Sequence, residues 1–416
     1  MNERNCMNNS SQICQYCYPE KPNHRQDKIN SLFFLIQNFF TSIFKILLFN
    51  KPIYFTDRYV IRSIIKCQKS NKIETKEEAN LSQMTYRLKL LWQEAKERNL
   101  KIYCFSMNGR QLLSFLLVYN GKKYYFHYTP TTLLHKNFKQ FKDPTIYDNK
   151  IKFKKILSKN KIPHPEGKVF FSRLKAFNYG KKLGFPLVVK PNSSSLSKHV
   201  TLNINDNDSL KSAIDVAKII DHKIIIERFI PGDVHRFMFL GDKLLVCSKR
   251  TRPSIIGDGK STVDALIDKF NSNPLRGKKN QEDRALGTIE KNTFLQKCLA
   301  DQGVHLKLKL DAGKKIFLAE KTNCSNGAEV INLTEDVCVE NYELFKKVHN
   351  SLKIAVTAID FICSDVSKPW HSQPFAMLEN NSFPDISPQH FPSSGKPVNV
   401  AKAIWGLVLE NLDKKV

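Results

Sequence analysis

The stretch from Lys150 to Ile230 most constrains the fold, because helical and strand patterns alternate along it. The segment "KIKFKKILSKN" has helical spacing and stops before Pro163 and Pro165, which cannot continue a helix. After it come the helix "RLKAFNYGKKLG", the strands "PLVVK" and "HVTLNI", the helix "DSLKSAIDVAKII" with Asp208 as its expected N-cap, and the strand "KIIIERFI". Such alternation is typical of a mixed α/β (α+β) fold.

Pattern and composition divide the chain into three predicted units. Residues 1–75 hold a polar tail, an apolar segment and a Lys-rich stretch, which we interpret as an N-terminal helical extension. Residues 76–148 hold one helical pattern and several strands, including a hairpin at Asn120-Gly121, and predict a small α/β domain. Residues 149–416 hold the alternating stretch, a second hairpin, a long polar connection and the last helices and strands, and we expect them to form the main domain.

The net charge of +27 favours an anionic partner, because an excess of one sign destabilises a compact chain through self-repulsion. Nucleic acid, a membrane surface and phosphorylated or acidic substrates all meet this condition. A nucleic-acid or membrane-surface protein that uses residues 20–160 is therefore one hypothesis. No aromatic-and-basic stripe on a recognisable nucleic-acid module supports it, so no specific nucleic-acid partner is expected.

The cysteines are dispersed, mostly in apolar surroundings, which is typical of reduced thiols in the cytoplasm. The first thirty residues hold no apolar core followed by a small-residue cleavage site, so no signal peptide is expected. Four side chains near the N-terminus are of the types that close a tetrahedral zinc site: Cys6, Cys14, Cys17 and His24. Their spacing is irregular, and the zinc site is one hypothesis beside that of ordinary polar-tail residues.

The segment "LFFLIQNFFTSIFKILLF", Leu32 to Phe49, has its polar residues on one side of a helix. A spanning helix would put this polar stripe in lipid, so an amphipathic helix fits better. Two interpretations stay open, packing onto the protein's own domain and lying on a membrane surface. We expect a cytoplasmic protein, with peripheral membrane contact through residues 32–49 as an open alternative.

Three oxygen-bearing side chains near the C-terminus form a candidate metal site. Asp360 lies in the strand-like "AIDFICSD", while Glu379 and Asn381 lie two residues apart at the end of "FAMLENN". Residues at i and i+2 of a strand point to the same face, so these side chains can converge on one hard cation. The pattern indicates Mg²⁺ at a nucleotide, with Mn²⁺ as an alternative.

Phosphate groups need positive charge on rigid elements. Lys190 ends the apolar strand "LVVK" and leads into a loop of small hydroxyl residues, and Lys150 starts a helix. Single surface lysines of this kind are common and are usually only solvated. Lys150 and Lys190 therefore indicate a phosphate site only in combination with the candidate metal-binding carboxylates.

Taken in order, these segments resemble the ATP-grasp superfamily, and more narrowly the ligase domains of cyanophycin synthetase and bifunctional glutathione synthetase, over residues 80–416. "NKIKFKKILSKNKIP" and "VVKP" are similar to the two phosphate-lysine motifs, although the usual Asp before the first lysine is Asn149 here. "IERFIPGDVHRFMFLGDKLLVCSKRTRPSIIGDGKSTVDALI" is similar throughout to the stretch from the adenine hinge to a "GDG" turn. "NCSNGAEVINLT", "AIDF" and "LENN" match the later motifs.

The resemblance implies an ATP-grasp fold and three sets of site residues. The implied metal ligands are Asp360, Glu379 and Asn381. The implied nucleotide-binding residues are Lys150, Lys190, Ser195, Ser197, Lys198, Glu227, Arg228, Phe229, Ile230 and Asp233. The implied catalytic residues, which face phosphate or acyl phosphate, are Lys190, Arg236 and Arg250.

The loop after Lys190 departs from the family's glycine-rich phosphate lid. The family's glycines fall at Ser197 and His199 in an alignment without gaps. Glycine lets backbone amides approach phosphates and lets a loop open and close. Ser197 and His199 can still donate hydrogen bonds and Lys198 adds charge, so we expect a stiffer lid, which responds to glycine at positions 197 and 199.

Two further departures concern the substrates. Relatives carry an acidic residue for the ribose at the position of Val234, and Asp233 is a substitute one residue earlier. The resemblance implies arginine at the position of Ala319, and Lys321 is a candidate replacement for it. These changes affect rate and substrate more than fold.

The family resemblance and the residues together lead to one main hypothesis. The chain is expected to be an ATP- and Mg²⁺-dependent, ADP-forming carboxylate–amine ligase that joins small amino acids or peptides through an acyl phosphate. The alternative is a non-catalytic ATP-grasp relative that binds a nucleotide or an acidic peptide as a regulator. A homodimer is left open, because relatives often pair.

Overall fold

The computed structural model describes residues 23–32, 55–137, 148–192, 198–277, 284–381 and 383–414. Several sequence predictions lie outside the described residues: the thiols of Cys6, Cys14 and Cys17, the loop residues Ser195 and Ser197, and the amphipathic segment after Leu32. Within the described ranges no helix has both the length and the apolar character to span a membrane.

The first module is built on a four-stranded antiparallel sheet with strands in sequence order: β1 (Glu74–Lys76), β2 (Lys101–Met107), β3 (Arg110–Tyr119) and β4 (Lys122–His127). The predicted hairpin is confirmed, since Asn120 and Gly121 have φ of 48° and 70°, as a two-residue turn of this kind requires. The surrounding helices are α3 (Phe55–Lys69), η1 (Leu81–Gln83), α4 (Tyr86–Glu97) and α5 (Thr132–Asn137).

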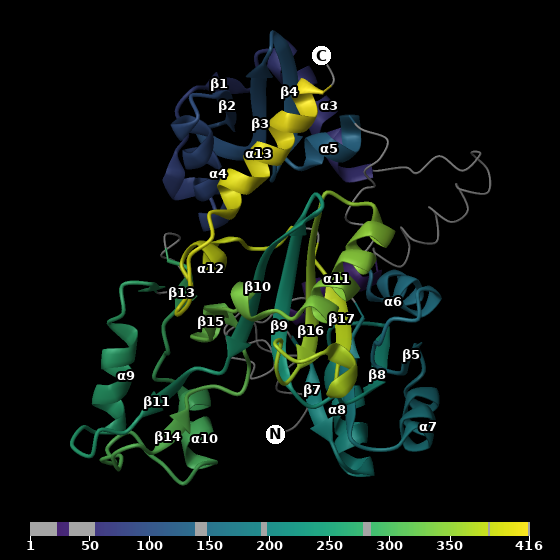
Figure 1. The fold of residues 1–416 in the computed structure, drawn as a ribbon, viewed down its shortest axis with the longest axis vertical. Helices are drawn as coiled ribbons and strands as arrows, with labels where there is room; N and C mark the ends of the chain where they lie inside the picture. Colours follow the sequence, from purple (N-terminus) through teal and green to yellow (C-terminus); the bar gives the residue numbers. More distant parts are fainter. Residues whose placement is uncertain are drawn as a thin grey trace.

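The last helix, α13 (Val400–Asp413), returns to this first module. Trp405 is fully buried there, and its indole Nε1 donates to the carbonyl of Leu91 at 2.8 Å. Its ring meets Phe126 edge-on at 5.9 Å between centroids. Figure 1 shows α13 in yellow running beside α4 and the sheet. Residues 55–137 and the last helix thus both contribute to this module, and the three-unit division of the sequence stays a prediction.

A five-stranded antiparallel sheet forms the centre of the molecule, in the order β15-β10-β9-β16-β17. Its strands are β9 (Asp233–Leu240), β10 (Lys243–Thr251), β15 (Glu329–Asn332), β16 (Val356–Cys363) and β17 (Ala376–Asn380). On one face, Phe237, Phe239 and Phe361 pack with α6 (Lys150–Lys159) and α11 (Val339–Leu352). On the other face, Met238 and Ala358 join the core of the first module. At one end of this second face, β9 and β16 carry the polar residues Arg236 and Asp360 instead of apolar core residues.

Another four-stranded antiparallel sheet, called the second sheet below, lies beside the central sheet and has the order β5-β8-β6-β7. Its strands are β5 (Gly167–Phe170), β6 (Leu187–Pro191), β7 (Thr201–Ile204) and β8 (Ile224–Arg228), and α7 (Arg173–Leu183) and α8 (Asn207–Lys218) cover it. The predicted N-cap of α8 is wrong by two residues. Asp206, not Asp208, accepts from the amide of Ser209 at 2.8 Å, so α8 begins earlier than its sequence suggests.

The expected long polar connection after β10 is wrong in part, because much of it is folded. It contains β11 (Ser254–Ile256), α9 (Val263–Asn271), β12 (Arg276–Gly277), β13 (Leu286–Gly287), α10 (Thr293–Ala300), β14 (Lys315–Phe317) and η3 (Cys324–Asn326). These elements share a small apolar core in which Ile267, Leu295 and Ile316 are buried. Short helices complete the chain: η4 (Thr334–Asp336), η5 (Trp370–Ser372) and α12 (Ser387–His390).

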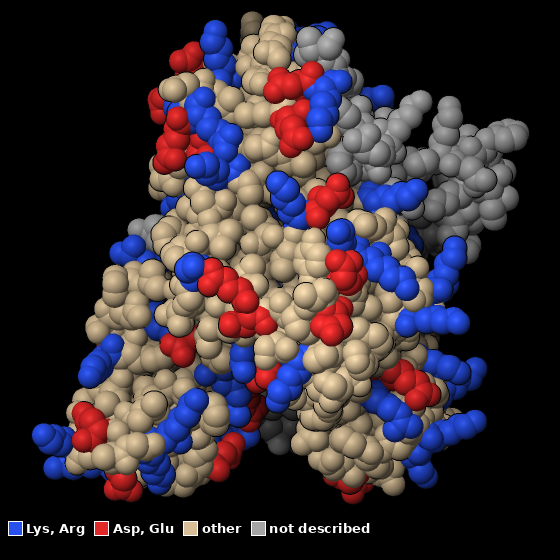
Figure 2. All heavy atoms as spheres, in the orientation of Figure 1, with Lys and Arg blue, Asp and Glu red and all other residues tan. Residues whose placement is uncertain are grey.

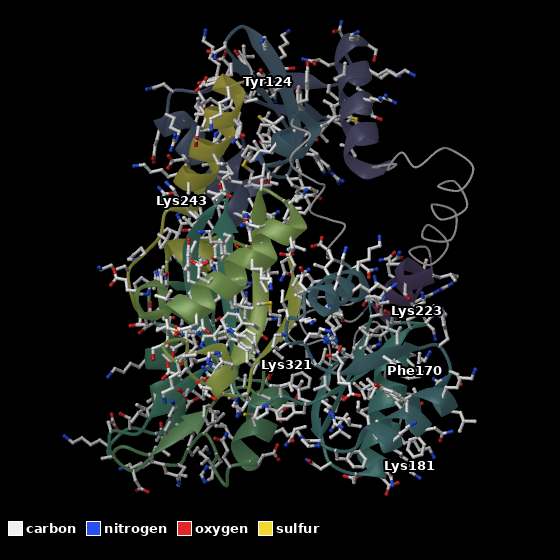
Figure 3. All side chains as sticks on the ribbon, turned by 45° about the vertical axis from the view of Figure 1, so that its right-hand side comes forward. Tyr124, Phe170, Lys181, Lys223, Lys243 and Lys321 are labelled. Carbon is white, nitrogen blue, oxygen red and sulfur yellow. The ribbon has the colours of Figure 1, made fainter. Side chains whose placement is uncertain are left out.

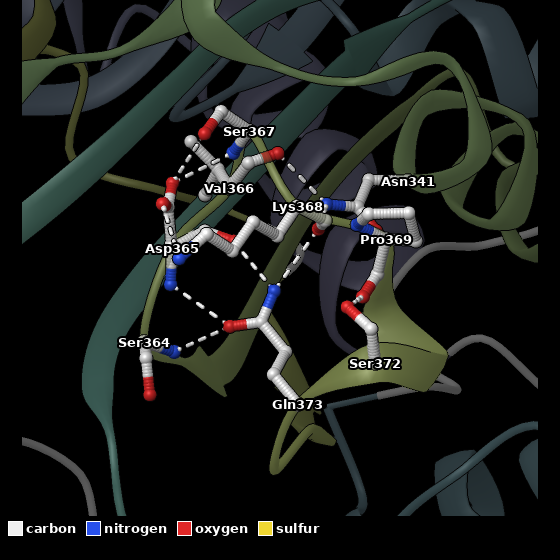
Figure 4. A network of polar contacts seen from close by, with 9 residues as sticks. All are labelled: Asn341, Ser364, Asp365, Val366, Ser367, Lys368, Pro369, Ser372 and Gln373. Atoms are coloured by element: carbon white, nitrogen blue, oxygen red, sulfur yellow. Dashed lines mark hydrogen bonds and ion pairs between the residues drawn. The ribbon is translucent and has the colours of Figure 1, made fainter.

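The connection between β16 and β17 is held by two amide side chains (Figure 4). Gln373 accepts from the backbone amides of Ser364 and Asp365, both at 2.9 Å, and donates back to the Asp365 carbonyl at 2.6 Å. Asn341 on α11 donates to the carbonyls of Val366 and Lys368. Because these bonds fix the hairpin, they also fix the strand register on which the candidate metal ligands depend.

Charged side chains are mixed over the face drawn in Figure 2. Lys and Arg side chains stand among Asp and Glu side chains there and form no continuous stripe. The same view shows the molecule hollowed at its lower centre, between the lobe of α10 and the lobe of α7 and α8. On this face the positive charge of the chain is spread rather than gathered into a track for a nucleic-acid backbone.

Candidate active site

The three predicted metal ligands lie together at one end of the central sheet. Asp360 on β16 is directly opposite Glu379 on β17 in the antiparallel register, so both side chains point to the same face. Asn381 follows β17, and its Nδ2 lies 3.5 Å from Oδ2 of Asp360. The structure therefore brings the two carboxylates and the amide together, as the spacing suggested.

Asp360 is held as a carboxylate by Arg236. The two guanidinium nitrogens Nε and Nη2 donate to its two oxygens at 2.6 and 2.8 Å, and both side chains are buried. Burial alone raises the pKa of Asp360, but the charge of Arg236, helped by that of Arg250, holds this pKa below its ordinary value. Arg236 thus contacts a carboxylate, and its expected role toward phosphate stays a prediction.

The donor set fits a hard divalent cation. Asp360 is ionised at neutral pH, Glu379 is partly exposed, and the amide of Asn381 adds a neutral oxygen. Among the described residues no group of three or more His, Cys, Asp or Glu side chains is placed to hold a metal ion. The candidate protein donors here are two carboxylates and the Asn381 amide. Such a mixture of few carboxylates with water or phosphate oxygens is what Mg²⁺ prefers.

Lys150 links the metal ligands to the second sheet. Its Nζ lies 2.7 Å from Oε2 of Glu379. Burial lowers the pKa of Lys150, but the negative charges of Glu379, Glu227 and Asp360 together raise it above the ordinary value. A permanently charged ammonium therefore stands between the two halves of the site.

Glu227 on β8 is enclosed by two ammonium groups. Its side chain is only 2% exposed, Lys190 at the end of β6 lies 2.9 Å from its Oε2, and Lys154 contacts its Oε1. Although burial raises the pKa of Glu227, the charges of Lys190 and Lys154 hold that pKa below its ordinary value. Lys190 is thus paired with the residue expected beside adenine.

Lys154 is a site residue that the sequence interpretation missed. It lies four residues after Lys150 on α6, and residues at i and i+4 share one helix face, so its position carried a usable signal. Burial lowers the pKa of Lys154 to about 8, and the neighbouring charges of Lys190 and Lys150 act in the same direction against the pull of Glu227. The site thus contains an ammonium that titrates just above neutral pH.

We expect Lys154 to make the stability of the chain rise with pH above pH 8. The folded chain loses this proton near a pKa of about 8, whereas the unfolded chain keeps it up to 10.5. Because the unfolded state binds more protons between these values, the free energy of unfolding increases across the window, by at most about 3 kcal/mol. Below pH 8 both states are protonated, and the folded chain carries the full penalty of a buried charge.

Urea unfolding at about pH 7.5 and about pH 9.5 measures this change. Lys154→Met should flatten the pH dependence, whereas Lys155→Met, which removes an exposed lysine from the same helix, should leave it as in the unchanged chain. Equal pH dependence in the two variants would contradict the role given to Lys154.

The expected adenine hinge is a continuous part of the second sheet. The amide of Arg228 donates to the carbonyl of Glu166 at 2.9 Å, and the amide of Phe229 donates to the carbonyl of Pro186 at 3.0 Å. Ile230 follows directly, half-buried. These bonds hold the segment from Arg228 to Ile230 next to Glu227, and its contact with adenine stays a prediction.

Asp233 is not brought into this cluster. Side chains alternate along a strand, so Asp233 lies on the opposite face of β9 from Arg236. Its carboxylate pairs with Lys249 at 2.5 Å. The structure therefore contradicts the idea that Asp233 replaces an acidic residue at Val234 after a small shift, because a one-residue shift changes the face.

Arg250 lies on the same face as the carboxylates. It is directly opposite Val234 on β9 and Val330 on β15, and its charge acts on Asp360. Ala319 offers its carbonyl to Nε of Arg252 at 2.9 Å. In the view of Figure 3, Lys321 lies between the lobe of α9 and α10 and the lobe of α7 and α8, and its role as a replacement for arginine stays a prediction.

The histidine of the loop after β6 does not face a phosphate site. His199 is fully buried, and its Nδ1 donates to the carbonyl of Val216 at 2.7 Å. The expectation that His199 donates a hydrogen bond to phosphate is therefore wrong. Lys198, one residue earlier, is half-buried and stays a candidate for charge near the loop.

Comparison with known proteins agrees with this geometry. Residues 147–251 match the RimK-like ATP-grasp domain. The cyanophycin synthetase of Crocosphaera subtropica is 30% identical over 261 residues, which cover 61% of this chain and 29% of that protein. The bifunctional glutathione biosynthesis protein of Streptococcus mutans is 30% identical over 227 residues, which cover 54% of this chain and 30% of that protein.

One solved structure matches most of the fold. The bifunctional glutathione synthetase of Pasteurella multocida aligns with 80% of this chain and 44% of its own, at a TM-score of 0.61 and 21% identity. The chain spans about 28% of the length of the first curated relatives that it matches. ATP-grasp ligases use ATP and Mg²⁺, the two groups for which the site has lysines and oxygen ligands. Residues 147–251 of this chain thus match a RimK-like ATP-grasp domain, and the fold around them is shared with a bifunctional glutathione synthetase.

Proposed function

We propose that the chain is an ATP-dependent carboxylate–amine ligase that forms an amide or peptide bond and releases ADP and phosphate. The observation that supports this most is the ion pair between Lys150 and Glu379 at 2.7 Å. It joins a lysine of the phosphate-binding type to a carboxylate of the metal-binding type. A triphosphate and a cation need these two groups side by side.

The proposed reaction has two steps. A substrate carboxylate oxygen attacks the γ-phosphorus of ATP, the bond from that phosphorus to the bridging oxygen breaks, and ADP leaves. The amine nitrogen of the second substrate then attacks the acyl carbon, the amide bond forms, and inorganic phosphate and a proton leave. No protein nucleophile is required, so positioning and charge account for catalysis.

The residues divide this work by their charge. Lys150 and Lys190 bind phosphate oxygens. When ATP binds, the ammonium group of Lys150 turns from Glu379 to the phosphates, and that of Lys190 turns from Glu227 to the phosphates. Arg250 and the Arg236 guanidinium oppose negative charge that develops on the transferred phosphoryl group. Asp360, Glu379 and Asn381 would hold Mg²⁺, which would neutralise phosphate charge when bound.

Further contacts complete the nucleotide site in this proposal. Glu227 and the backbone of Arg228, Phe229 and Ile230 hold adenine. The loop residues Ser195, Ser197 and Lys198 close over the phosphates.

The substrate class follows from the relatives. Cyanophycin synthetase and the bifunctional glutathione biosynthesis protein are named for amide-linked amino-acid products, which supports a small amino acid or peptide as substrate here. We place the activity in the cytoplasm. The cysteines described as free thiols support a reducing compartment: Cys67, Cys104, Cys247, Cys298, Cys324, Cys338 and Cys363.

Phosphate release from MgATP, measured with single amino acids, pairs of amino acids and dipeptides, tests the proposal. We expect release of ADP and phosphate that depends on a carboxylate and an amine together. ATP binding measured by calorimetry without turnover for any pair would contradict a ligase. That result would favour the second candidate, a nucleotide-binding regulator, which is supported by the buried His199 at a position where the resembled family carries glycine.

A further inference from the structure

Two lysines of α6 pair with carboxylates on two different sheets. Lys150 lies 2.7 Å from Glu379 on β17 of the central sheet. Lys154, one helical turn further on, contacts Oε1 of Glu227 on β8 of the second sheet. It also donates to the carbonyl of Pro165 at 3.4 Å. The helix thus presents positive charge to both sheets of the site, and the proposed reaction gives a role to the first of these lysines only.

Glu227 is a carboxylate that needs a cation beside it. Its side chain is only 2% exposed, so water does not solvate its charge. Lys190 lies 2.9 Å from Oε2, whereas Lys154 contacts the other oxygen, Oε1. The two ammonium groups occupy separate oxygens, so one of them is able to leave without displacing the other. If both left, the buried carboxylate would carry the full penalty of an unpaired charge.

The proposed function takes one of these two cations away, because Lys190 turns from Glu227 to the phosphates when ATP binds. We propose, on the basis of that function, that Lys154 is a positioning residue that stays on Glu227 as its permanent counter-ion and thereby releases Lys190 for the phosphates. Without Lys154, binding would leave a bare buried carboxylate, and Lys190 would be held on Glu227.

The contacts of the two lysines support this division of roles. Nζ of Lys154 is held by two acceptors, Oε1 of Glu227 and the carbonyl of Pro165. For Lys190, the described part of the chain supplies Glu227 as its one ion-pair partner. Lys190 also ends β6, directly before the loop whose sequence indicates a phosphate site. Lys190 therefore has less to lose by turning to a ligand, and Lys154 is the better anchored of the two.

The movement of Lys190 also makes Lys154 a stronger counter-ion. Burial lowers the pKa of Lys154, and the charges of Lys190 and Lys150 act in the same direction, against the attraction of Glu227. When Lys190 and Lys150 turn to the phosphates, their repulsion of Lys154 is offset by the negative charge of the ligand. Lys154 then keeps its proton more firmly, at the moment when Glu227 depends on it.

Binding of inorganic triphosphate with Mg²⁺ to the full-length chain, measured by calorimetry, tests the proposal. This probe lacks adenine, so a change at Glu227 affects it through the phosphates alone. Lys154→Met should lower its affinity at least about tenfold, because Lys190 is then held on Glu227. Lys154→Arg keeps the positive charge and should recover most of the affinity. Lys155→Met, at an exposed position on the same helix, should bind as the unchanged chain does.

The double variant Lys154→Met with Glu227→Gln separates a counter-ion from a direct phosphate ligand. Glu227→Gln alone removes the carboxylate that competes for Lys190 and should raise the affinity for triphosphate. In that background Lys154→Met should lower the affinity by at most about threefold, since no buried carboxylate is left to balance.

Two results would overturn the proposal and leave the proposed function standing. One is an equal loss of affinity from Lys154→Met with and without Glu227→Gln, which would mean that Lys154 contacts the phosphates itself. The other is an unchanged affinity of Lys154→Met. An unchanged chain that binds neither triphosphate nor ATP would instead overturn the proposed function, and the role of Lys154 with it.

Discussion

Glu379→Gln is expected to lower ATP turnover at least about 100-fold, equivalent to about 2.7 kcal/mol of transition-state stabilisation. The substitution keeps the shape of the side chain and removes its charge. A neutral amide binds Mg²⁺ far more weakly than a carboxylate and no longer pairs with Lys150, which lies 2.7 Å from Glu379. Because the side chain is 30% exposed, the change should leave the fold intact.

Phosphate release at a series of Mg²⁺ concentrations measures this effect. A loss of metal affinity appears as a shift of the half-saturating Mg²⁺ concentration, which a general loss of folding does not produce. Glu343→Gln, at an exposed position on α11, is the matched control and should behave as the unchanged chain. Unchanged turnover of Glu379→Gln at limiting Mg²⁺ would exclude Glu379 as a ligand.

The structure explains why Glu379 is a better test than Asp360. Both variants, and the double variant Asp360→Asn with Glu379→Gln, should lose ATP turnover under the proposal. Asp360, however, is the partner of the buried Arg236, and its removal leaves an unpaired charge that costs about 3–5 kcal/mol of stability. A loss of turnover in Asp360→Asn can therefore come from the site or from lost stability, whereas in Glu379→Gln it comes from the site.

Local patterns predicted much of the site. Strand alternation was enough to place Glu379 and Asn381 on one face, and an Asn-Gly pair was enough to place the hairpin at Asn120. Both depend on residues close in sequence, where backbone geometry fixes the outcome. Which residues pair with Asp360 and Glu227 depends on packing between distant elements, and the sequence alone contains no such information.

Two errors have the same physical origin. The sequence offers Asp233 as a substitute for an acidic residue at Val234, but one step along a strand reverses the direction of the side chain. Its residue type also makes His199 a candidate phosphate donor in the loop, but His199 is buried against Val216 and His24. Residue type and approximate position were informative in both cases, and the direction of the side chain was decided by strand register and tertiary packing.

Lys150→Met is the second variant with a large expected effect, a loss of ATP affinity of about 100-fold, or about 2.7 kcal/mol. Lys150 is the positive charge nearest to Glu379, and it also acts on Glu227 and Asp360. Without it, Glu379 has lost its ion-pair partner and the site has one positive charge fewer, so the field that attracts a triphosphate is weaker. Binding of a non-hydrolysable ATP analogue, measured by calorimetry, should show this loss.

Two companion variants separate charge from packing at this position. Lys150→Arg keeps the charge and should recover most of the affinity, while Lys155→Met removes an exposed lysine from the same helix and should change it little. If only the net charge of the protein mattered, Lys150→Met and Lys155→Met would lower the affinity for the ATP analogue equally. That result would refute a direct contact between Lys150 and the phosphates. Lys150 and Glu379 are in contact, so the effects of their substitutions on ATP affinity should not be additive. In a chain that already carries Glu379→Gln, Lys150→Met should lower the affinity less than it does in the unchanged chain. The reason is that fewer negative charges are left to repel the phosphates.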